Sequence, residues 1–461
     1  MGSPLLHLDE ARSRSIAALQ GFLAAHAEVE RAVLVDDLFG AVRVVVWVKN
    51  AAGLGALEPE LRRLLEEAGS QLWSGDLWIA GSGTASEDQF LHDAAWDEGA
   101  PVDPTSNAGR LRLNDRHRNR SSWFLPLKDR ETLRPEGLTE DEGAAKRTRI
   151  VVFHSFKGGV GRTTSLAAYA LAHARRSERV AIVDMDLDAP GIGRLLDVDG
   201  EGTTARWGVV DYLLEAKHPL ELSDYFHTCA REALTSPGLI EVFPGGQLDD
   251  GYLGKLARVD LEVGRTPAGH PLFALLKRIE LERKPSMILV DGRAGLSPGA
   301  GLVLSGFADL HVLFATVNPQ SLQGLNRVIR HLGNEQARHG RPQLECVVVQ
   351  ALVPEDAAVA AQVQEAFAGQ ILEMFESGYY AKPPARQAGA SSESQFDDAL
   401  WTLDDLDSSV APHRPVAIRY RASIASSTSI DQIGSDLLQG DHALLAERLD
   451  QRLGMSHGQG T

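Results

Sequence analysis

Cysteine is almost absent from this chain. Its 461 residues include two cysteines, Cys229 and Cys346, which lie far apart among apolar neighbours. Neither belongs to a CxxC pair or a Cys/His cluster, so the sequence excludes a disulfide framework and a zinc site. Thiols without partners suit a reducing compartment, and we therefore predict a cytoplasmic protein.

Long apolar runs are absent as well. Nowhere do 18 apolar residues follow one another, so we expect no membrane span. The first residues, MGSPLLHLDEARS, lack the basic and then apolar order of a secretory signal. A net charge of −17 excludes a protein that coats nucleic acid over its whole surface and leaves only a local basic patch for that purpose.

The composition is that of a globular protein with two or three domains. Hydrophobic residues make up 43% of the chain and charged residues 24%. Residues 1–126 predict a small α+β N-terminal domain that binds a partner or target. Its expected elements are a helix over 8–26, strands over 31–35 and 41–48, a helix over 59–67 and a strand over 77–79.

A larger domain follows a charged linker. Residues 127–147 have no apolar period and predict the linker, and the second domain covers 148–455. Short continuous apolar runs alternate there with helical segments, which indicates an α/β fold with a parallel sheet flanked by helices. The expected strands are 150–153, 180–183, 287–290, 311–315, 346–349 and 416–418, with a closing helix over 429–453.

An insertion at 383–413 interrupts this alternation. It contains a proline pair, the Ser-rich AGASSES and the acidic DDALWTLDDLDSS. Two interpretations remain open, namely a mobile loop and an acidic recognition element around Trp401.

A glycine-rich loop after the first strand of the larger domain carries the chemistry. A phosphate cradle needs successive backbone N–H groups that point inward, and glycines permit this. The helix that follows offers its N-terminal N–H groups and positive dipole end to the same anion. The loop comprises Lys157, Gly158, Gly159, Val160, Gly161, Arg162, Thr163 and Thr164.

This loop resembles the deviant Walker A motif of the ParA/MinD family of P-loop ATPases, K-G-G-x-G-K-[ST]-T. The exception is Arg162, which stands where the family has lysine; the form KGGVGR-[ST] is similar to a bacterial branch in which Arg is usual. The resemblance implies a P-loop NTPase fold with ATP and Mg²⁺ as cofactors. It also implies a homodimer with ATP between the subunits, in which Lys157 reaches the partner's nucleotide.

Two acidic strand ends complete the expected site. The resemblance assigns Asp186 to the attacking water and to the metal region, with Asp184 supporting its loop. Asp291 ends an apolar strand, as in a Walker B motif, and would hold Mg²⁺ together with Thr163. Gly295 would then sense the γ-phosphate. The candidates for reading the base are Gln350 and the segment 418–420, where the family more often has proline at the place of Arg419.

Three functions are compatible with this sequence. The first is an ATP-dependent dimerisation switch that hydrolyses ATP to ADP and phosphate, with Lys157, Arg162 and Asp186 as its catalytic residues, and that controls a protein partner. The second is a hydrolytically silent nucleotide-binding scaffold of a bacterial complex, such as a defence complex, because Arg162 and Arg293 depart from the family pattern. The third, which is less favoured, is a partition-like ATP-dependent DNA-binding protein.

Two surface segments bear on these alternatives. Residues 110–120 contain five arginines and precede Trp123, so they either bind nucleic acid or form a salt-bridged part of the N-terminal domain, which we favour. Near the C-terminus, Leu444, Leu445, Leu449 and Leu453 share a helical face with mixed flanking charges. This pattern favours packing in the core over membrane binding.

Overall fold

The chain forms two units, Met1–Leu125 and Pro126–Thr461. The computed structural model describes residues 6–37, 40–49, 54–80, 86–102, 109–116, 123, 148–196, 205–217, 221–229, 231–261, 270–334, 336, 343–381, 401–427 and 429–455. The expected linker at 127–147 lies outside these residues, and so does most of the expected insertion.

The N-terminal unit is built on a five-stranded sheet in the order β3-β2-β1-β5-β4. Strands β1 (Val29–Asp36) and β2 (Val42–Val48) pair antiparallel, which confirms the predicted pair. Strand β3 (Trp73–Ala80) extends the sheet beside β2, while β5 (Leu111–Asp115) pairs with β1 and with the short β4 (Ala100–Pro101). The sequence prediction does not include β5, because its polar residues indicate a charged segment.

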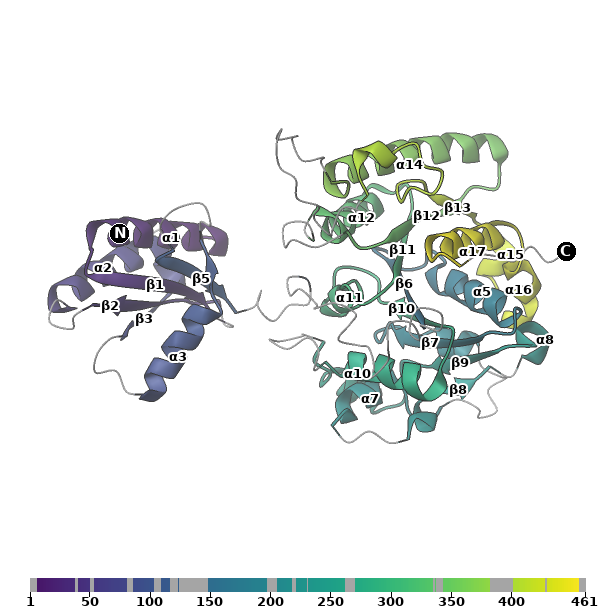
Figure 1. Cartoon of the computed structure of the whole chain (residues 1–461), viewed down its shortest axis with the longest axis horizontal. Coiled ribbons are helices and arrows are strands. Elements are labelled where there is room, and N and C mark those ends of the chain that lie inside the picture. The colour runs from purple at the N-terminus through teal and green to yellow at the C-terminus, as the bar shows by residue number, and fades with distance from the viewer. Residues whose placement is uncertain are drawn as a thin grey trace, which may run out of the picture. The chain divides into compact units, whose positions relative to one another are not determined.

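Helices cover both faces of this sheet (Figure 1). On one face α1 (Leu8–Ala25) and α2 (Leu54–Gly69) bury an aliphatic core against the valines of β1 and β2. On the other face α3 (Ser86–Asp97) packs Ala95 and Trp96 against the opposite side of these strands. The sequence does not predict α3, because polar residues outnumber apolar ones along it.

The arginines of the 110–120 segment belong to the packing of this unit where the structure describes them. The Arg110 guanidinium donates to the backbone oxygens of Leu23 at 2.9 Å and His26 at 3.1 Å. Arg112 donates to the carbonyl of Trp96 at 3.0 Å, and its guanidinium carbon lies 4.4 Å from the centre of a Trp96 ring. This supports the structural interpretation of both arginines; residues 117–120 lie outside the described part.

The C-terminal unit contains an eight-stranded sheet in the order β13-β12-β11-β6-β10-β7-β9-β8. All neighbours pair in parallel except β8 and β9, which confirms the predicted α/β class. The inner strands are buried on both faces, as their unbroken apolar sequences predict. The strands are β6 (Arg149–Ser155), β7 (Arg179–Met185), β8 (His227–Thr228), β9 (Leu239–Phe243), β10 (Met287–Gly292), β11 (Leu310–Ala315), β12 (Cys346–Val353) and β13 (Val416–Arg419).

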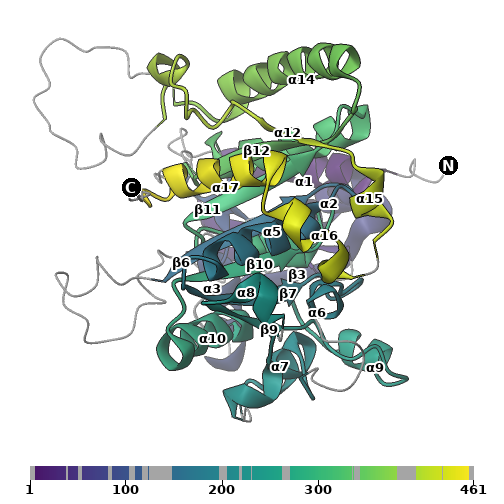
Figure 2. The same ribbon diagram turned by 90° about the vertical axis from the view of Figure 1, so that its right-hand side faces the viewer.

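Helices flank this sheet on both sides. Helices α5 (Arg162–Ala174), α16 (Ile430–Leu437) and α17 (Gly440–Arg452) cover the face that is turned to the viewer in Figure 2. Helices α10 (Pro271–Arg278), α11 (Pro298–Val303) and α12 (Pro319–Leu332) lie on the opposite side, to the left of the strands in Figure 1. The other connecting helices are α6 (Ile192–Leu195), α7 (Val209–Glu215), α8 (Glu232–Thr235), α9 (Tyr252–Leu256), α14 (Ala357–Gly378) and α15 (Ala422–Ala425).

The closing helix predicted over 429–453 is two helices, α16 and α17. The break comes at Gly440, whose φ of 59° is left-handed and which no side-chain periodicity indicates. Leu445 and Leu449 are buried as predicted, whereas Leu444 is 58% exposed. Helix α17 packs mainly into the core, and the expectation of a single apolar face is wrong at Leu444.

The described end of the insertion is attached to its own unit. The indole Nε1 of Trp401 donates to Glu345 at 2.8 Å, and the Arg452 guanidinium carbon lies 4.5 Å from the centre of a Trp401 ring. These contacts fix Trp401 to its own unit, and the mobile loop and the acidic recognition element both stay predictions. Residues 382–400 lie outside the described part.

Two further expectations concern the cysteines, which are predicted to form no disulfide framework, and the membrane spans, of which none is predicted. Cys229 and Cys346 are both buried thiols. No helix of the described chain is at once long enough and apolar enough to cross a bilayer.

Candidate functional site: a phosphate-binding loop closed by ion pairs

The glycine-rich loop connects β6 to α5 and is shaped by backbone conformations that favour glycine. Gly159 has a φ of 72° and Gly161 a φ of 78°, both left-handed. A Cβ added at Gly158, Gly159 or Gly161 would meet no atom within 4 Å. Gly159 and Gly161 are therefore required by the backbone path and not by crowding, and the space beside the loop is open to a ligand.

Helix α5 begins directly at this loop. Its N-cap is Gly161, which offers no side-chain acceptor to the first N–H groups of the helix. Those groups and the positive end of the helix dipole therefore remain available to an anion. The 13-residue helix is held firmly, since most of its residues are buried between the sheet and α17.

Phe156 anchors the start of the loop. A Cβ built on Gly324 in α12 would lie 2.0 Å from the Phe156 ring, so this ring rests where α12 has no side chain. This contact explains why an aromatic residue can occupy the position that holds the first glycine of an ordinary Walker A motif. Sequence alone offers no signal for the pairing, because Gly324 lies inside an otherwise regular helix.

Arg162 lies inside the site and joins two acidic residues. Its Nε donates to Asp291 Oδ1 and its Nη2 to Asp186 Oδ2, each at 2.6 Å. Its side chain is 8% exposed, and those of Asp186 and Asp291 are 14% and 1% exposed. Burial acts to lower the pKa of Arg162, but the two carboxylates outweigh it and the pKa is raised. The arginine is charged and firmly paired.

Thr163 and Asp291 are in contact, as expected for two residues that share a metal. The Thr163 hydroxyl donates to Asp291 Oδ2 at 2.7 Å. Burial raises the pKa of Asp291, and Arg162 and Thr163 partly offset this. A hydroxyl beside a carboxylate fits Mg²⁺, which prefers oxygen ligands and keeps several waters or phosphate oxygens. Among the described residues no three His, Cys, Asp or Glu side chains form a ready metal cage, so a nucleotide would have to supply further ligands.

Asp184 supports the loop that carries Asp186. Its carboxylate accepts the backbone N–H of Asp186 at 3.1 Å and of Gly191 at 3.2 Å. Burial, aided by the charge of Asp291, raises the pKa of Asp184 well above its usual value. The positive charge of Arg162 acts to lower the pKa of Asp184 but does not outweigh burial.

A second ion pair links the loops after β7 and β10. Arg293 Nη1 lies 2.7 Å from Asp188 Oδ2, with both side chains 38% exposed. In the same loop the Gly295 N–H donates to the carbonyl of Ser155 at 3.0 Å, with a left-handed φ of 89° at Gly295. Arg293 thus forms a salt bridge within the loops, and the Gly295 amide bonds to β6.

The remaining loop residues differ in burial. Lys157 is half-buried and forms no ion pair with any described residue, while Val160 is buried and Thr164 is half-buried.

His154 lies on β6, directly before the loop, and is buried. Its burial and, to a smaller extent, the charge of Arg162 lower its pKa to about 3. His154 is therefore neutral near pH 7 and does not act as a cationic phosphate ligand.

Gln350, a candidate for reading the base, lies away from the glycine-rich loop. It lies in β12, separated from β6 by β11, and it is buried. Its amide Nε2 donates to the carbonyl of Val363 in α14 at 3.3 Å. The side chain is thus turned into the packing of α14, and the expectation that it reads a base is not supported.

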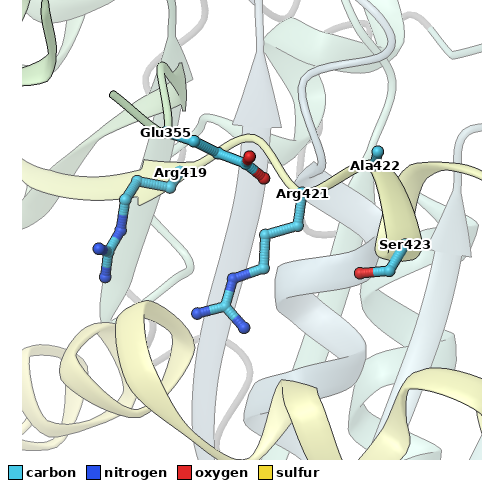
Figure 3. A pocket seen from close by; sticks show the side chains of 5 residues that line it. All are labelled: Glu355, Arg419, Arg421, Ala422 and Ser423. Atoms are coloured by element: carbon cyan, nitrogen blue, oxygen red, sulfur yellow. The ribbon is translucent and has the colours of Figure 1, made fainter. Parts of the chain in front are cut away.

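An open pocket lies instead after β12 and β13. It has a volume of about 300 Å³ and is lined by Glu355, Arg419, Arg421, Ala422 and Ser423. Figure 3 shows these side chains, with Arg421 extending below Glu355. Arg419 is bound to Asp441 through two guanidinium nitrogens at 2.9 and 2.6 Å. Arg419 belongs to the segment 418–420 that the sequence indicates as a candidate for reading the base, whereas no motif marks Glu355 or Arg421.

Comparison with known proteins finds a family model that matches the region of the loop. Residues 151–375 match the family model described as the CobQ/CobB/MinD/ParA nucleotide binding domain. Over these residues the chain is similar to the nucleotide-binding domains of the MinD/ParA type. The glycine-rich loop lies at the start of the matched region.

Individual relatives agree with this assignment. The septum site-determining protein MinD of Escherichia coli K12 is 26% identical over 204 residues, which cover 41% of this chain and 61% of MinD. The chain thus spans about three fifths of the length of that relative. The iron-sulfur cluster carrier protein of Pseudomonas fragi is 44% identical over 61 residues, covering 13% of this chain and 21% of the carrier.

Solved structures give a more distant likeness. MinD of Pyrococcus horikoshii, solved with Mg-ADP, has a TM-score of 0.33 at 21% identity and covers 47% of this chain and 77% of its own. A variant of Cyanothece McdA in complex with ATP has a TM-score of 0.41 at 15% identity, covering 68% of this chain and 98% of its own.

Proposed function

We propose that the C-terminal unit binds ATP with Mg²⁺ at residues 157–164 and works as a nucleotide-dependent dimerisation switch. The observation that carries this proposal is the convergence of the glycine loop, Thr163, Asp186 and Asp291 at the start of α5. In this arrangement backbone N–H groups would hold the phosphates, and the helix dipole would favour their charge.

The metal would be held by Thr163 and Asp291. Their oxygens are already adjacent, and a bound Mg²⁺ would neutralise charge on the terminal phosphates. The remaining metal ligands would come from phosphate oxygens and water.

Hydrolysis would depend on Asp186. A carboxylate at this place can orient a water molecule and accept its proton, provided that Arg162 has moved away from it. Asp184 holds the Asp186 backbone N–H, so the loop is positioned independently of Arg162. Loss of the terminal phosphate would then leave the Gly295 loop free to change conformation.

Dimerisation would involve Lys157. This half-buried lysine has no ion-pair partner among the described residues, so its ammonium is available to a nucleotide on a second subunit. The N-terminal unit would present a separate surface to a protein partner, whose assembly the nucleotide state would control.

ATP hydrolysis is tested by comparing phosphate release by the wild type and by Asp186→Ala. We expect turnover to fall by at least about 100-fold while calorimetric binding of ATP·Mg²⁺ persists. Glu365→Ala, which alters an exposed carboxylate on α14, should match the wild type. Equal phosphate release from wild type and Asp186→Ala would reject hydrolysis at this site.

A test of the switch compares sedimentation with ATP·Mg²⁺ and with ADP. The wild type should pair with ATP alone, and Lys157→Ala should stay monomeric with either nucleotide. A monomer in both conditions would reject dimerisation and leave nucleotide binding standing.

The second candidate is a nucleotide-binding scaffold that does not hydrolyse ATP. It is favoured by the bond between Arg162 and Asp186, which engages the carboxylate needed for water activation. The two candidates diverge in one measurement: a scaffold binds ATP·Mg²⁺ but releases no phosphate in single-turnover conditions.

A further inference from the structure

Arg162 occupies the place of a cation between Asp186 and Asp291. We infer that Arg162 is an internal counter-ion that keeps divalent metal out of the site until a triphosphate replaces the two carboxylates as its partner. This rests on the proposed roles of Thr163 and Asp291 as metal ligands. It assigns Arg162 a positioning role that a phosphate-binding lysine would not fulfil.

The geometry of the guanidinium is the first support. Two different nitrogens, Nε and Nη2, donate to two different residues, each at 2.6 Å. A guanidinium presents several donors in a fixed fork, whereas an ammonium is a point charge on a flexible stem. Arginine therefore ties the β7 loop to the β10 strand in a way that lysine cannot reproduce.

Burial is the second support. Asp291 is 1% exposed in its side chain, so little water is present to screen a second cation beside Arg162. A divalent ion on Asp291 and Thr163 would stand close to the guanidinium, and like charges repel strongly where water is scarce. Removal of the guanidinium without a replacement charge would conversely leave a buried carboxylate unpaired.

A nucleotide resolves this conflict by supplying new anions. Phosphate oxygens can accept both the guanidinium and the metal, so Arg162 can turn from the carboxylates to the phosphates as Mg²⁺ reaches Asp291. The same movement would free Asp186 from its ion pair. Metal entry, arginine movement and exposure of Asp186 would thus be one coupled event.

The test measures binding of Mn²⁺ alone, by electron paramagnetic resonance, to the nucleotide-free full-length chain. We expect no site in the wild type at millimolar metal and at least about tenfold tighter binding in Arg162→Met. The double variant Arg162→Met/Asp291→Asn should lose this site. Arg175→Met, at the exposed C-terminal end of the same helix, is the matched control and should behave as wild type.

Two results would overturn the inference. One is a single Mn²⁺ site of equal affinity in wild type and Arg162→Met; the other is the absence of any site in a folded Arg162→Met variant. If that variant does not fold, Arg162→Lys decides, because a single ammonium cannot bridge both carboxylates in the same way and should admit Mn²⁺ more tightly than the wild type. Equal affinities for the Lys variant and the wild type would contradict the inference.

The readout is independent of ATP turnover. If Mn²⁺ binding follows the expected order but ATP does not bind, the proposed function fails and the counter-ion role stands. If ATP·Mg²⁺ binds and is hydrolysed while the affinity for Mn²⁺ is the same in the wild type and the Arg162 variants, the counter-ion role is rejected and the proposed function stands.

Discussion

Arg162 and Arg110, one from each unit, are held by different kinds of partner. In the C-terminal unit, Arg162 bonds to the carboxylates of Asp186 and Asp291. In the N-terminal unit, Arg110 bonds to the main-chain carbonyls of Leu23 and His26. A carboxylate titrates and can be exchanged for a phosphate as the partner of an arginine, whereas a main-chain carbonyl does neither. The first arrangement suits a site that changes state, and the second suits a fixed scaffold.

The largest effect is expected at Asp450, which fastens α17 to the phosphate-loop helix. This fully buried carboxylate accepts from Tyr169 at 2.8 Å and Arg176 at 2.7 Å and lies 2.9 Å from His173. Asp450→Ala would leave these donors without their acceptor and lower the free energy of unfolding of this unit by about 3 kcal/mol. Urea unfolding measures this loss. Glu447→Ala, on the exposed side of α17, should change the value by no more than about 0.5 kcal/mol.

The same cluster makes the stability of this unit depend on pH. Burial acts to lower the pKa of His173, but Asp450 and Glu178 outweigh it and raise the pKa above 6.5. Burial acts to raise the pKa of Asp450, but its hydrogen bonds outweigh that and lower the pKa below 3.8.

The contribution of His173 is therefore complete below pH 6.5 and is lost as pH rises through the raised pKa of the folded state. The contribution of Asp450 is present above pH 3.8 and is lost as pH falls through its lowered pKa. Unfolding measured at about pH 6 and about pH 9 should show lower stability at the higher pH. His173→Gln should reduce this difference; an unchanged difference would show that other groups cause it.

A smaller effect, independent of pH, is expected in the N-terminal unit. Arg110→Met removes the donor that joins the end of α1 to the start of β1 through several carbonyls. We expect a loss of about 2 kcal/mol in the unfolding free energy of this unit, equal at both pH values because neither partner titrates. Arg14→Met, which breaks only an exposed pair with Glu10, should cost at most about 0.5 kcal/mol. A loss that varied with pH would contradict the comparison between Arg162 and Arg110.

The smallest effect is expected at Arg31. Its cation–π contacts with Trp47 and Trp96 and its half-exposed pair with Asp93 at 3.1 Å should together contribute about 1 kcal/mol, so Arg31→Leu should destabilise the N-terminal unit by that amount and shift tryptophan fluorescence. Arg31→Lys retains the charge and should recover part of the loss. Identical stability of wild type and Arg31→Leu would show that neither the ring contacts nor the pair with Asp93 stabilises this unit.

Much of the nucleotide-binding unit can be predicted from sequence because its signals are local. Buried parallel strands are short unbroken apolar runs, and glycines after β6 indicate a backbone that only glycine adopts easily. Strand β5 and helix α3 in the N-terminal unit escape prediction, since their polar residues interrupt any apolar period that would mark them.

The amino-acid order is sufficient to specify the glycine loop, the α/β class and the acidic strand ends that converge on α5. The partners of these residues emerge only in the folded chain: Arg162 against Asp186 and Asp291, Phe156 against Gly324, and Gln350 turned towards α14. The difference arises from separation along the chain. Backbone conformation follows from neighbouring residues, whereas the acceptor of a buried charge is chosen by whichever element the fold brings beside it.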